Sequence, residues 1–501
     1  MTALPPRLGR AALLLLLPAL AACAGHDLRL ARDAEARGDA QAALAHYRSA
    51  AEAGDAEAQF RLAKALRGDP AAALPWAERA AAANHVGALR LAGDLLVDPK
   101  SPVHDPARAT GYYARAAGGG DAAAAHRLGR LYAGGGPVAA HPALALAYLR
   151  QAADAGDNRA KLRLAQALAD GRLGRRDPAA ATALLESAAA AGEAGAWLAL
   201  GDAHAPGGWL PTDRAKSRLY WTRASQAGLA GATLALARDL RRDGRPAAAE
   251  AAALYRQAGE QGEAKAWREL AALVRDGGLA RQPAVAVEHL TRAAQAGDNA
   301  ARLALGDLYA EGRSVRRDAA KALAHWRAAA EGGEAKGWRR IGNAHAEGGL
   351  VRRDPARAAE AWRKAAAAGD AESHLRLARA LADGEAPRRR AGQALAHWRQ
   401  AAALGDARAL VDLGDIHAEG VVVPADPAKA RDYWRQAIRK GEADGAVRLA
   451  RALAKGTLGE TDIEGAIAAW EQARRLGHRG AAEEVAKLRA RQQRQAVAGD
   501  A

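Results

Sequence analysis

The stretch WRAAAEGG, residues 326–333, is one copy of a pattern that recurs along the chain. An aromatic residue or Leu stands first, Ala-type residues follow three and four positions later, and Gly usually stands seven positions later. From Tyr113 onward the copies are mostly 36 residues apart. The first position is filled by Tyr47, Trp76, Tyr113, Leu149, Leu185, Trp221, Tyr255, Leu290, Trp326, Trp362, Trp398, Trp434 and Trp470. Thirteen copies at a near-constant period indicate a repeat array.

Each copy carries the signals of two helices. An Asp often stands eight residues before the aromatic residue or Leu of the pattern. As an N-cap, its side chain can accept a hydrogen bond from a free backbone N–H. These residues are Asp39, Asp105, Asp177, Asp213, Asp318, Asp354, Asp426 and Asp462. Four of them are followed at once by a proline that suits the first helical position, namely Pro106, Pro178, Pro355 and Pro427. The helix is expected to end at a left-handed Gly such as Gly369, and Leu at helical spacing marks the next helix.

A single pair of such short helices cannot cover its own apolar face, so neighbouring copies must stack. We therefore predict an all-α fold, a right-handed α-solenoid of about 12–13 helix-turn-helix repeats over residues 27–480. The part 27–104 is expected to be more irregular, because the Trp76 copy follows after only 29 residues and lacks the Gly. Residues 481–501 are expected to form a capping helix and a disordered tail.

The composition agrees with this fold class. Half of the 501 residues are apolar but only 4% are aromatic, so the apolar share is mostly Ala, a strong helix former. β-Branched and aromatic residues are too scarce for a β-sandwich or barrel. One Trp or Tyr per copy is expected in the core between helices. Glycines within the Leu-bearing helices, such as Gly306 and Gly342, are explained by close approach of a neighbouring helix.

Residues 1–22 have the features of an export signal. Arg7 and Arg10 precede an apolar run over residues 11–20 that is too short to span a bilayer. The run leads into LAAC, residues 20–23, which resembles the lipobox of bacterial lipoproteins. The resemblance implies cleavage before Cys23, acylation of Cys23, an anchor over residues 23–26, and an address on the periplasmic face of the outer membrane. An ordinary secretory signal with a chance Cys is the alternative.

A family resemblance rests on Leu305–Gly312, Val315–Asp318 and Ala322–Gly333. These stretches resemble the Sel1-like repeat, a relative of the tetratricopeptide repeat, and the resemblance covers residues 27–480. It implies a surface that binds other proteins. The start of the mature chain, residues 23–48, also resembles the scaffold lipoproteins of alginate secretion. That resemblance implies envelope partners, namely an outer-membrane porin and periplasmic subunits of a polysaccharide exporter, with an anionic polysaccharide as cargo.

The charge of the chain points to anionic partners. The formal net charge is +16, and 61 of the 73 basic residues are Arg, which contacts carboxylate or phosphate bidentately. Loops between units carry arginines at nearly the repeat period, which predicts a basic stripe along one edge. Its residues are Arg175, Arg176, Arg316, Arg317, Arg352, Arg353, Arg388, Arg389 and Arg390. The export signal argues against nucleic acid and leaves acidic polysaccharide, lipid or protein; a merely solvated surface is the alternative.

No catalytic or metal motif is evident. The single Cys excludes disulfides and cysteine-built metal sites. His204, His345 and His417 occupy the slot of Tyr132 and Tyr309 in separate repeats, so we expect neither metal nor cofactor. Acidic residues at the equivalent place in their repeats mark a structural or solvated position, and these are Glu311, Glu347 and Glu419.

We expect an interaction scaffold and no enzyme. A periplasmic regulator that binds a sensor kinase is a second hypothesis. An enzyme acting on envelope glycans is a third, from a different class.

Overall fold

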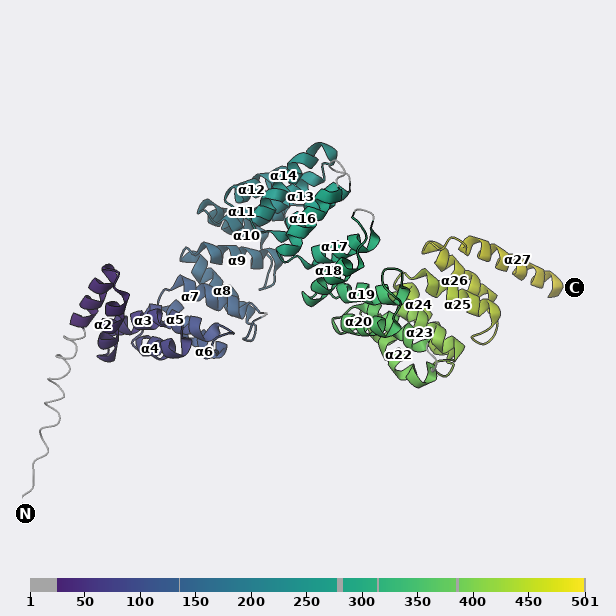
Figure 1. Cartoon of the computed structure of the whole chain (residues 1–501), viewed down its shortest axis with the longest axis horizontal. Helices are drawn as coiled ribbons and strands as arrows, with labels where there is room; N and C mark the ends of the chain where they lie inside the picture. Colours follow the sequence, from purple (N-terminus) through teal and green to yellow (C-terminus); the bar gives the residue numbers. More distant parts are fainter. Residues whose placement is uncertain (1–24, 135, 277–282, 313–314, 384–386, 500–501) are drawn as a thin grey trace, which may run out of the picture. The chain divides into compact units, whose positions relative to one another are not determined.

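The computed structural model describes residues 25–134, 136–276, 283–312, 315–383 and 387–499. Every regular element in these ranges is helical, and consecutive helices pack against each other, as Figure 1 shows. The predicted α-solenoid is therefore confirmed. The chain divides into two compact units between Asp239 and Leu240, and each is described by itself. The predicted signal peptide, residues 1–22, and Cys23 lie outside the described residues.

In the first unit a helix over residues 25–36 precedes α2. The helices that follow are α2 (Ala40–Glu52), α3 (Ala56–Ala65), α4 (Pro70–Ala82), α5 (Val86–Val97), α6 (Pro106–Gly118), α7 (Ala122–Tyr132), α8 (Pro142–Asp154), α9 (Asn158–Asp170), α10 (Pro178–Ala190), α11 (Ala194–His204) and α12 (Arg214–Gln226). Helix α13 (Ala230–Arg241) contains the boundary between the units.

The second unit continues with η1 (Arg245–Ala247), α14 (Ala248–Glu260), α15 (Ala264–Arg275), α16 (Pro283–Gln295), α17 (Asn299–Glu311), α18 (Ala319–Glu331), α19 (Lys336–Glu347), α20 (Pro355–Ala367), α21 (Ala371–Ala382), α22 (Pro387–Ala403), α23 (Ala407–Glu419), α24 (Pro427–Arg439), α25 (Ala443–Lys455), α26 (Ile463–Arg475) and α27 (Ala481–Gly499). None of the described helices is both long and apolar enough to cross a bilayer.

The predicted helix boundaries are confirmed by the cap geometry. All eight predicted N-cap aspartates accept a hydrogen bond from the backbone N–H three residues later, at 2.7–3.0 Å. The four predicted prolines stand at the start of their helices. Gly369 has φ +85°, a left-handed conformation that a residue with a Cβ rarely adopts.

The second copy of the pattern is registered one residue later than its sequence suggests. Ala77 is fully buried where an aromatic residue was expected, whereas Trp76 is only half-buried. Asn84, seven residues after Ala77, has φ +59° and takes the place of the left-handed Gly. Asn tolerates this conformation better than most residues. The assignment of Trp76 to the core position was therefore wrong, because packing selected the small residue and placed the Trp at the rim.

Apart from Trp76, the predicted core residues on the even-numbered helices are buried. Trp326 of α18 is 4% exposed and lies against Gly306 of α17. A Cβ on Gly306 would lie 2.3 Å from the indole Cδ1, closer than real contacts allow. Gly342 and Trp362 repeat this contact at 2.4 Å in the next repeat. The glycine is needed at these positions because the indole occupies the space of a side chain.

A hydrogen bond fixes the orientation of each such indole. Trp326 donates its Nε1–H to Asp307, the residue after the glycine, at 2.9 Å. Asp307 also pairs with Arg340 of α19 at 3.1 Å, so the same carboxylate joins two odd-numbered helices. In α23 the equivalent carboxylate, Asp415, accepts from Trp434 at 3.0 Å and pairs with Arg448 at 3.0 Å. Each of these carboxylates thus connects one repeat to the next.

An indole turns the other way where the glycine is replaced. Ala378 stands in the glycine position of α21, and its Cβ fills the space that an indole uses elsewhere. Trp398 remains 3% exposed, but it donates its Nε1–H forward to Asp412 of α23 at 2.9 Å. The indole of Trp398 is bonded to the following odd-numbered helix because α21 offers it neither the glycine nor the acceptor: Arg379 stands where α17 has Asp307.

The C-terminal segment caps the second unit. Helix α27 packs on α26 and buries Ala481, Val485 and Leu488. It extends to Gly499, so the expected capping helix covers nearly all of residues 481–501. Residues 500 and 501 lie outside the described ranges.

Replacing Gly342 with Ala should lower the free energy of unfolding by about 1–3 kcal/mol, because the new methyl group displaces the indole of Trp362. Urea denaturation followed by Trp fluorescence measures the change. Gly392, exposed in α22 with no atom near its missing Cβ, is the matched control. Gly392→Ala should stabilise by about 0.5–1 kcal/mol. Equal effects of the two substitutions would contradict the contact.

Replacing Asp415 with Asn should stabilise the protein more at about pH 8 than at about pH 5. Burial raises the pKa of Asp415 to about 6, so the folded chain binds this proton more readily than the unfolded chain. The stability of the wild type should therefore fall as pH rises through the folded pKa, whereas Asn carries no charge. Asn343 shows that an amide holds the indole, since it accepts from Trp362 at 3.0 Å.

Unfolding curves at the two pH values measure the effect. The reciprocal variant Asn343→Asp should show the opposite pH trend, and a pH-independent difference for Asp415→Asn would refute the assignment.

Candidate functional site

Some of the predicted stripe arginines are bonded to the backbone. Arg176 donates to the carbonyl oxygen of Trp209 at 3.3 Å. Arg317 donates to the carbonyl oxygens of Ala310 at 3.1 Å and of Gly349 at 2.9 Å. Each guanidinium reaches the loop of the following repeat. These two arginines therefore connect neighbouring loops.

Other stripe arginines are exposed and make no hydrogen bond or ion pair with the described part of the chain. They are Arg175, Arg316, Arg352, Arg353 and Arg390. The triplet Arg388–Arg390 does not lie in a loop, as expected, but in the first turn of α22, which begins at Pro387. The side chains of Arg388 and Arg389 are outside the described set.

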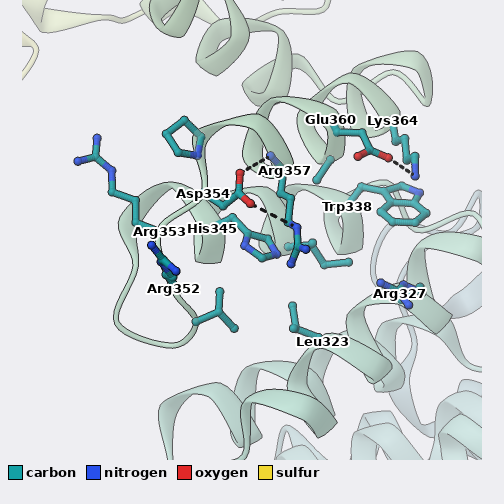
Figure 2. Close-up of a pocket in the computed structure, with 14 residues that line it drawn as sticks. Leu323, Arg327, Trp338, His345, Arg352, Arg353, Asp354, Arg357, Glu360 and Lys364 are labelled. Atoms are coloured by element: carbon teal, nitrogen blue, oxygen red, sulfur yellow. Dashed lines mark hydrogen bonds and ion pairs between the residues drawn. The ribbon is translucent and has the colours of Figure 1, made fainter.

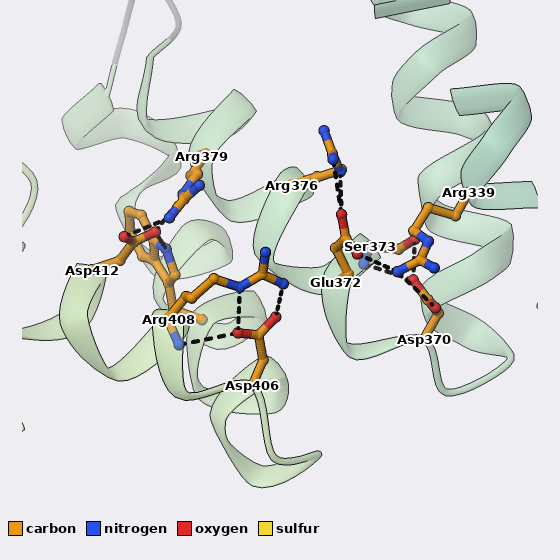
Figure 3. Close-up of polar contacts among 10 residues, drawn as sticks. Arg339, Asp370, Glu372, Ser373, Arg376, Arg379, Asp406, Arg408 and Asp412 are labelled. Atoms are coloured by element: carbon orange, nitrogen blue, oxygen red, sulfur yellow. Dashed lines mark hydrogen bonds and ion pairs between the residues drawn. The ribbon is translucent and has the colours of Figure 1, made fainter. Parts of the chain in front are cut away.

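The odd-numbered helices present cations that are already neutralised. A hollow of about 500 Å³ over α21 contains Arg376, Arg379 and Arg408. Figure 3 shows their partners, which are Glu372 at 2.8 Å, Asp412 at 2.6 Å and Asp406 at 2.7 Å respectively. Burial of Glu372 disfavours its charge, but hydrogen bonds from Arg376 and the charge of Arg339 hold its pKa below the usual value. These paired charges have little attraction left for a ligand.

A larger groove, of about 840 Å³, lies between α18 and α20 with α19 as its floor, and it holds unpaired cations (Figure 2). Arg327, Arg352 and Arg353 line it and make no ion pair or hydrogen bond with the described residues. Its remaining charges are paired locally: Arg357 with Asp354 at 3.3 Å, and Lys364 with Glu360 at 3.0 Å. The groove therefore carries a net positive charge at its rim.

The groove exists because one side chain is small. In four other repeats, the Tyr or His near the end of an odd-numbered helix stacks on a ring sixteen residues later in the next helix. The pairs are Tyr132–Tyr148, His204–Tyr220, Tyr309–His325 and His417–Tyr433, with ring centroids 5.7–6.3 Å apart. The corresponding pair in α19 and α20 is His345 and Ala361. No ring stands at position 361, and the groove opens beside His345, which is nevertheless only 9% exposed.

The floor of the groove is formed by aromatic and apolar side chains of α18 and α19. His345 is 9% exposed and lines the groove, and its Nδ1 has no hydrogen-bond partner. Trp338 lies beside it, with the Lys364 ammonium 4.8 Å from the ring centroid. Leu323 and Ile341 supply apolar surface. The groove thus combines a buried imidazole that lacks a stacked ring, apolar walls and free guanidinium groups.

The same space recurs three repeats later, but its rim is different. A groove of about 370 Å³ lies between α24 and α26, where Leu453 and Ala469 occupy the positions of His345 and Ala361. Glu460 and Thr461 stand where Arg352 and Arg353 do. This second groove lacks the imidazole and the two loop arginines, but Arg435 stands at the position of Arg327, and Arg431 and Arg439 also line it.

The three histidines singled out in the sequence lie in separate helices, and no three metal-ligating side chains converge within the described ranges. Glu311, Glu347 and Glu419 are exposed, as the sequence indicated. Sequence reasoning found Arg352 and Arg353 but missed Arg327 and the groove. The sequence does indicate the groove at Ala361, because the equivalent position holds Tyr or His in several other repeats.

Comparison with known proteins gives a family match. The model of the family described as Sel1 repeat matches residues 32–55, 56–85, 88–121, 122–157, 158–193, 196–229, 233–263, 268–298, 299–334, 339–370, 371–406 and 407–442. Each full repeat begins with an odd-numbered helix, so the arginine-bearing loops lie within repeats and not between them. A search of curated proteins gave no match.

Two solved structures are similar to the chain. A protective antigen of uropathogenic Escherichia coli with an SLR fold is 22% identical with a TM-score of 0.46, over 83% of this chain and 90% of that one. A Sel1 repeat protein from Oxalobacter formigenes is 28% identical with a TM-score of 0.44, over 66% of this chain and 88% of that one.

Proposed function

This chain belongs to the Sel1 repeat family, whose repeats mediate protein–protein interactions, and we propose that it is a non-enzymatic scaffold anchored in the bacterial outer membrane. The observation that carries the proposal is the array of stacked repeats, which exposes many side chains at regular intervals without a catalytic motif. The chain acts by holding other proteins in place.

The proposed location in the outer membrane follows from the first residues of the chain. The basic and apolar leader ends in LAAC, residues 20–23, and Cys23 is the only cysteine. Acylation at one residue with several chains would anchor the protein stably. Ala24 follows Cys23, which favours the outer membrane over inner-membrane retention. The partners are then envelope proteins.

The resemblance of residues 23–48 to scaffold lipoproteins of alginate secretion supports a specific role. In it, the chain assembles an outer-membrane porin with periplasmic subunits of a polysaccharide exporter. The unpaired arginines would attract the carboxylates of the exported polymer. A sensor kinase as the main partner would instead support the regulatory hypothesis.

Replacing Cys23 with Ser should move the protein out of the membrane fraction, because the acylated thiol is lost. Fractionation and density-gradient separation of outer and inner membranes measure the location. Partners that co-purify with the tagged wild type should be identified by mass spectrometry, with the Cys23→Ser variant as the control. Wild-type protein found in the soluble fraction would contradict the proposal of a membrane-anchored scaffold.

The unpaired stripe arginines should give salt-sensitive binding to polyuronate. Replacing Arg175 and Arg316 with Ser should weaken binding at low ionic strength and flatten its salt dependence, because fewer counterions are exchanged. Titration of the purified chain with alginate oligomers measures this. The matched control is Arg176 and Arg317, which are bonded to backbone carbonyls. Replacing this control pair should lower the free energy of unfolding and leave the affinity for alginate nearly unchanged. If the variant of Arg175 and Arg316 binds alginate as the wild type does, the stripe is a solvated surface and not a binding site.

A further inference from the structure

The groove between α18 and α20 has the properties of a binding site. Its floor contains His345, a buried imidazole with an unpartnered Nδ1, and its rim contains three unpaired arginines. These observations are independent, because one concerns a missing ring and the other concerns uncompensated charge. We propose that this groove binds an acidic peptide segment of a partner protein, with an aromatic side chain of that segment stacked over His345.

The aromatic side chain is indicated by the equivalent positions in other repeats. At His417 the space over the imidazole is filled by Tyr433, with centroids 5.7 Å apart and ring planes 18° apart. At Tyr309 it is filled by His325, 5.7 Å away with planes 3° apart. Ala361 provides no such ring beside His345, and the groove opens at this position. A ring supplied by a partner restores a contact that the fold makes elsewhere from its own residues.

The acidic residues are indicated by the charges around that space. Five basic side chains and two acidic ones line the groove, and both acidic ones are paired with a lining cation. Arg327, Arg352 and Arg353 are left without a counter-charge in the described chain. Figure 2 shows Arg327 and Arg352 on opposite sides of His345, whereas the side chain of Arg353 extends away from it. Glu or Asp residues flanking the inserted ring would meet these guanidinium groups and form charge-assisted hydrogen bonds.

A peptide fits the groove better than a polyuronate does. A uronate chain offers carboxylates, but it has no planar ring to stack on the imidazole. Leu323, Ile341 and Val351 add apolar surface that an aromatic side chain would cover. The choice of a protein partner rests on the proposed scaffold function, and the groove specifies the sequence chemistry of that partner.

The test uses the full chain purified in detergent and a dansyl-labelled peptide in which one Tyr is flanked by Glu residues. Fluorescence anisotropy should show saturable binding that weakens with salt. The same peptide with Ala in place of Tyr should bind about tenfold or more weakly. Ala361→Tyr should fill the space with the chain's own ring. The affinity for the Tyr peptide should then fall by about the same factor.

Two further variants separate the ring from the charge. Arg352→Ser with Arg353→Ser, both on an exposed loop, should weaken binding and remove most of its salt dependence while leaving the helical circular dichroism unchanged. Tyr433→Ala removes the ring beside His417, where Pro424 and Ala425 stand in place of Arg352 and Arg353 and Arg399 stands in place of Arg327. It should create no second binding site.

Several results would overturn the inference. Equal binding of the Tyr and Ala peptides would show that no ring enters the groove. Wild-type affinity in Ala361→Tyr would place the peptide elsewhere. Alginate binding that is lost in Ala361→Tyr would make the groove a polysaccharide site. Peptide binding that fails while envelope partners still co-purify overturns this inference alone, whereas peptide binding by a chain found outside the membrane overturns only the proposed location.

Discussion

Each repeat depends on how closely an indole can approach the facing helix. Trp326 occupies the volume that a side chain on Gly306 would fill, and its N–H is fixed by Asp307, the next residue. The same carboxylate then pairs with Arg340 of the following repeat. One contact therefore sets helix spacing, ring orientation and the link between repeats. In a linear array, stability is the sum of such local contacts, so each contact matters to its neighbours.

Small departures from the repeat have local structural consequences. With Ala378 and Arg379 in place of the glycine and the carboxylate, the indole of Trp398 donates its N–H to Asp412 of α23. The absence of a ring at Ala361 leaves His345 without a stacked partner beside the largest of the grooves described above. Because the surrounding repeats keep the backbone fixed, a substitution in one copy changes the surface without changing the fold. The array can in this way carry a specific site on a uniform framework.

The arginines show why charge in a sequence does not by itself locate a binding surface. Arg317 and Arg353 occupy equivalent positions, yet Arg317 is bonded to two backbone carbonyls and Arg353 has no partner in the described chain. On the odd-numbered helices, Arg376, Arg379 and Arg408 are neutralised by carboxylates of the same or the next helix. What remains for a ligand is the unpaired fraction, and part of it, Arg327 and Arg352, lines the groove that contains His345.

The helices, their caps and the repeat period were determined by the sequence alone, because N-cap aspartates, left-handed glycines and 36-residue spacing act through local backbone geometry. The buried aromatic positions were predictable for the same reason, except at Trp76, where packing chose Ala77. Only the tertiary structure decided which arginines are free and where the groove lies. Those properties depend on contacts between residues about one repeat apart, such as Arg317 with Gly349, and on the space left when a partner ring is missing. Local periodicity records that two residues are equivalent, but it does not record what each one touches.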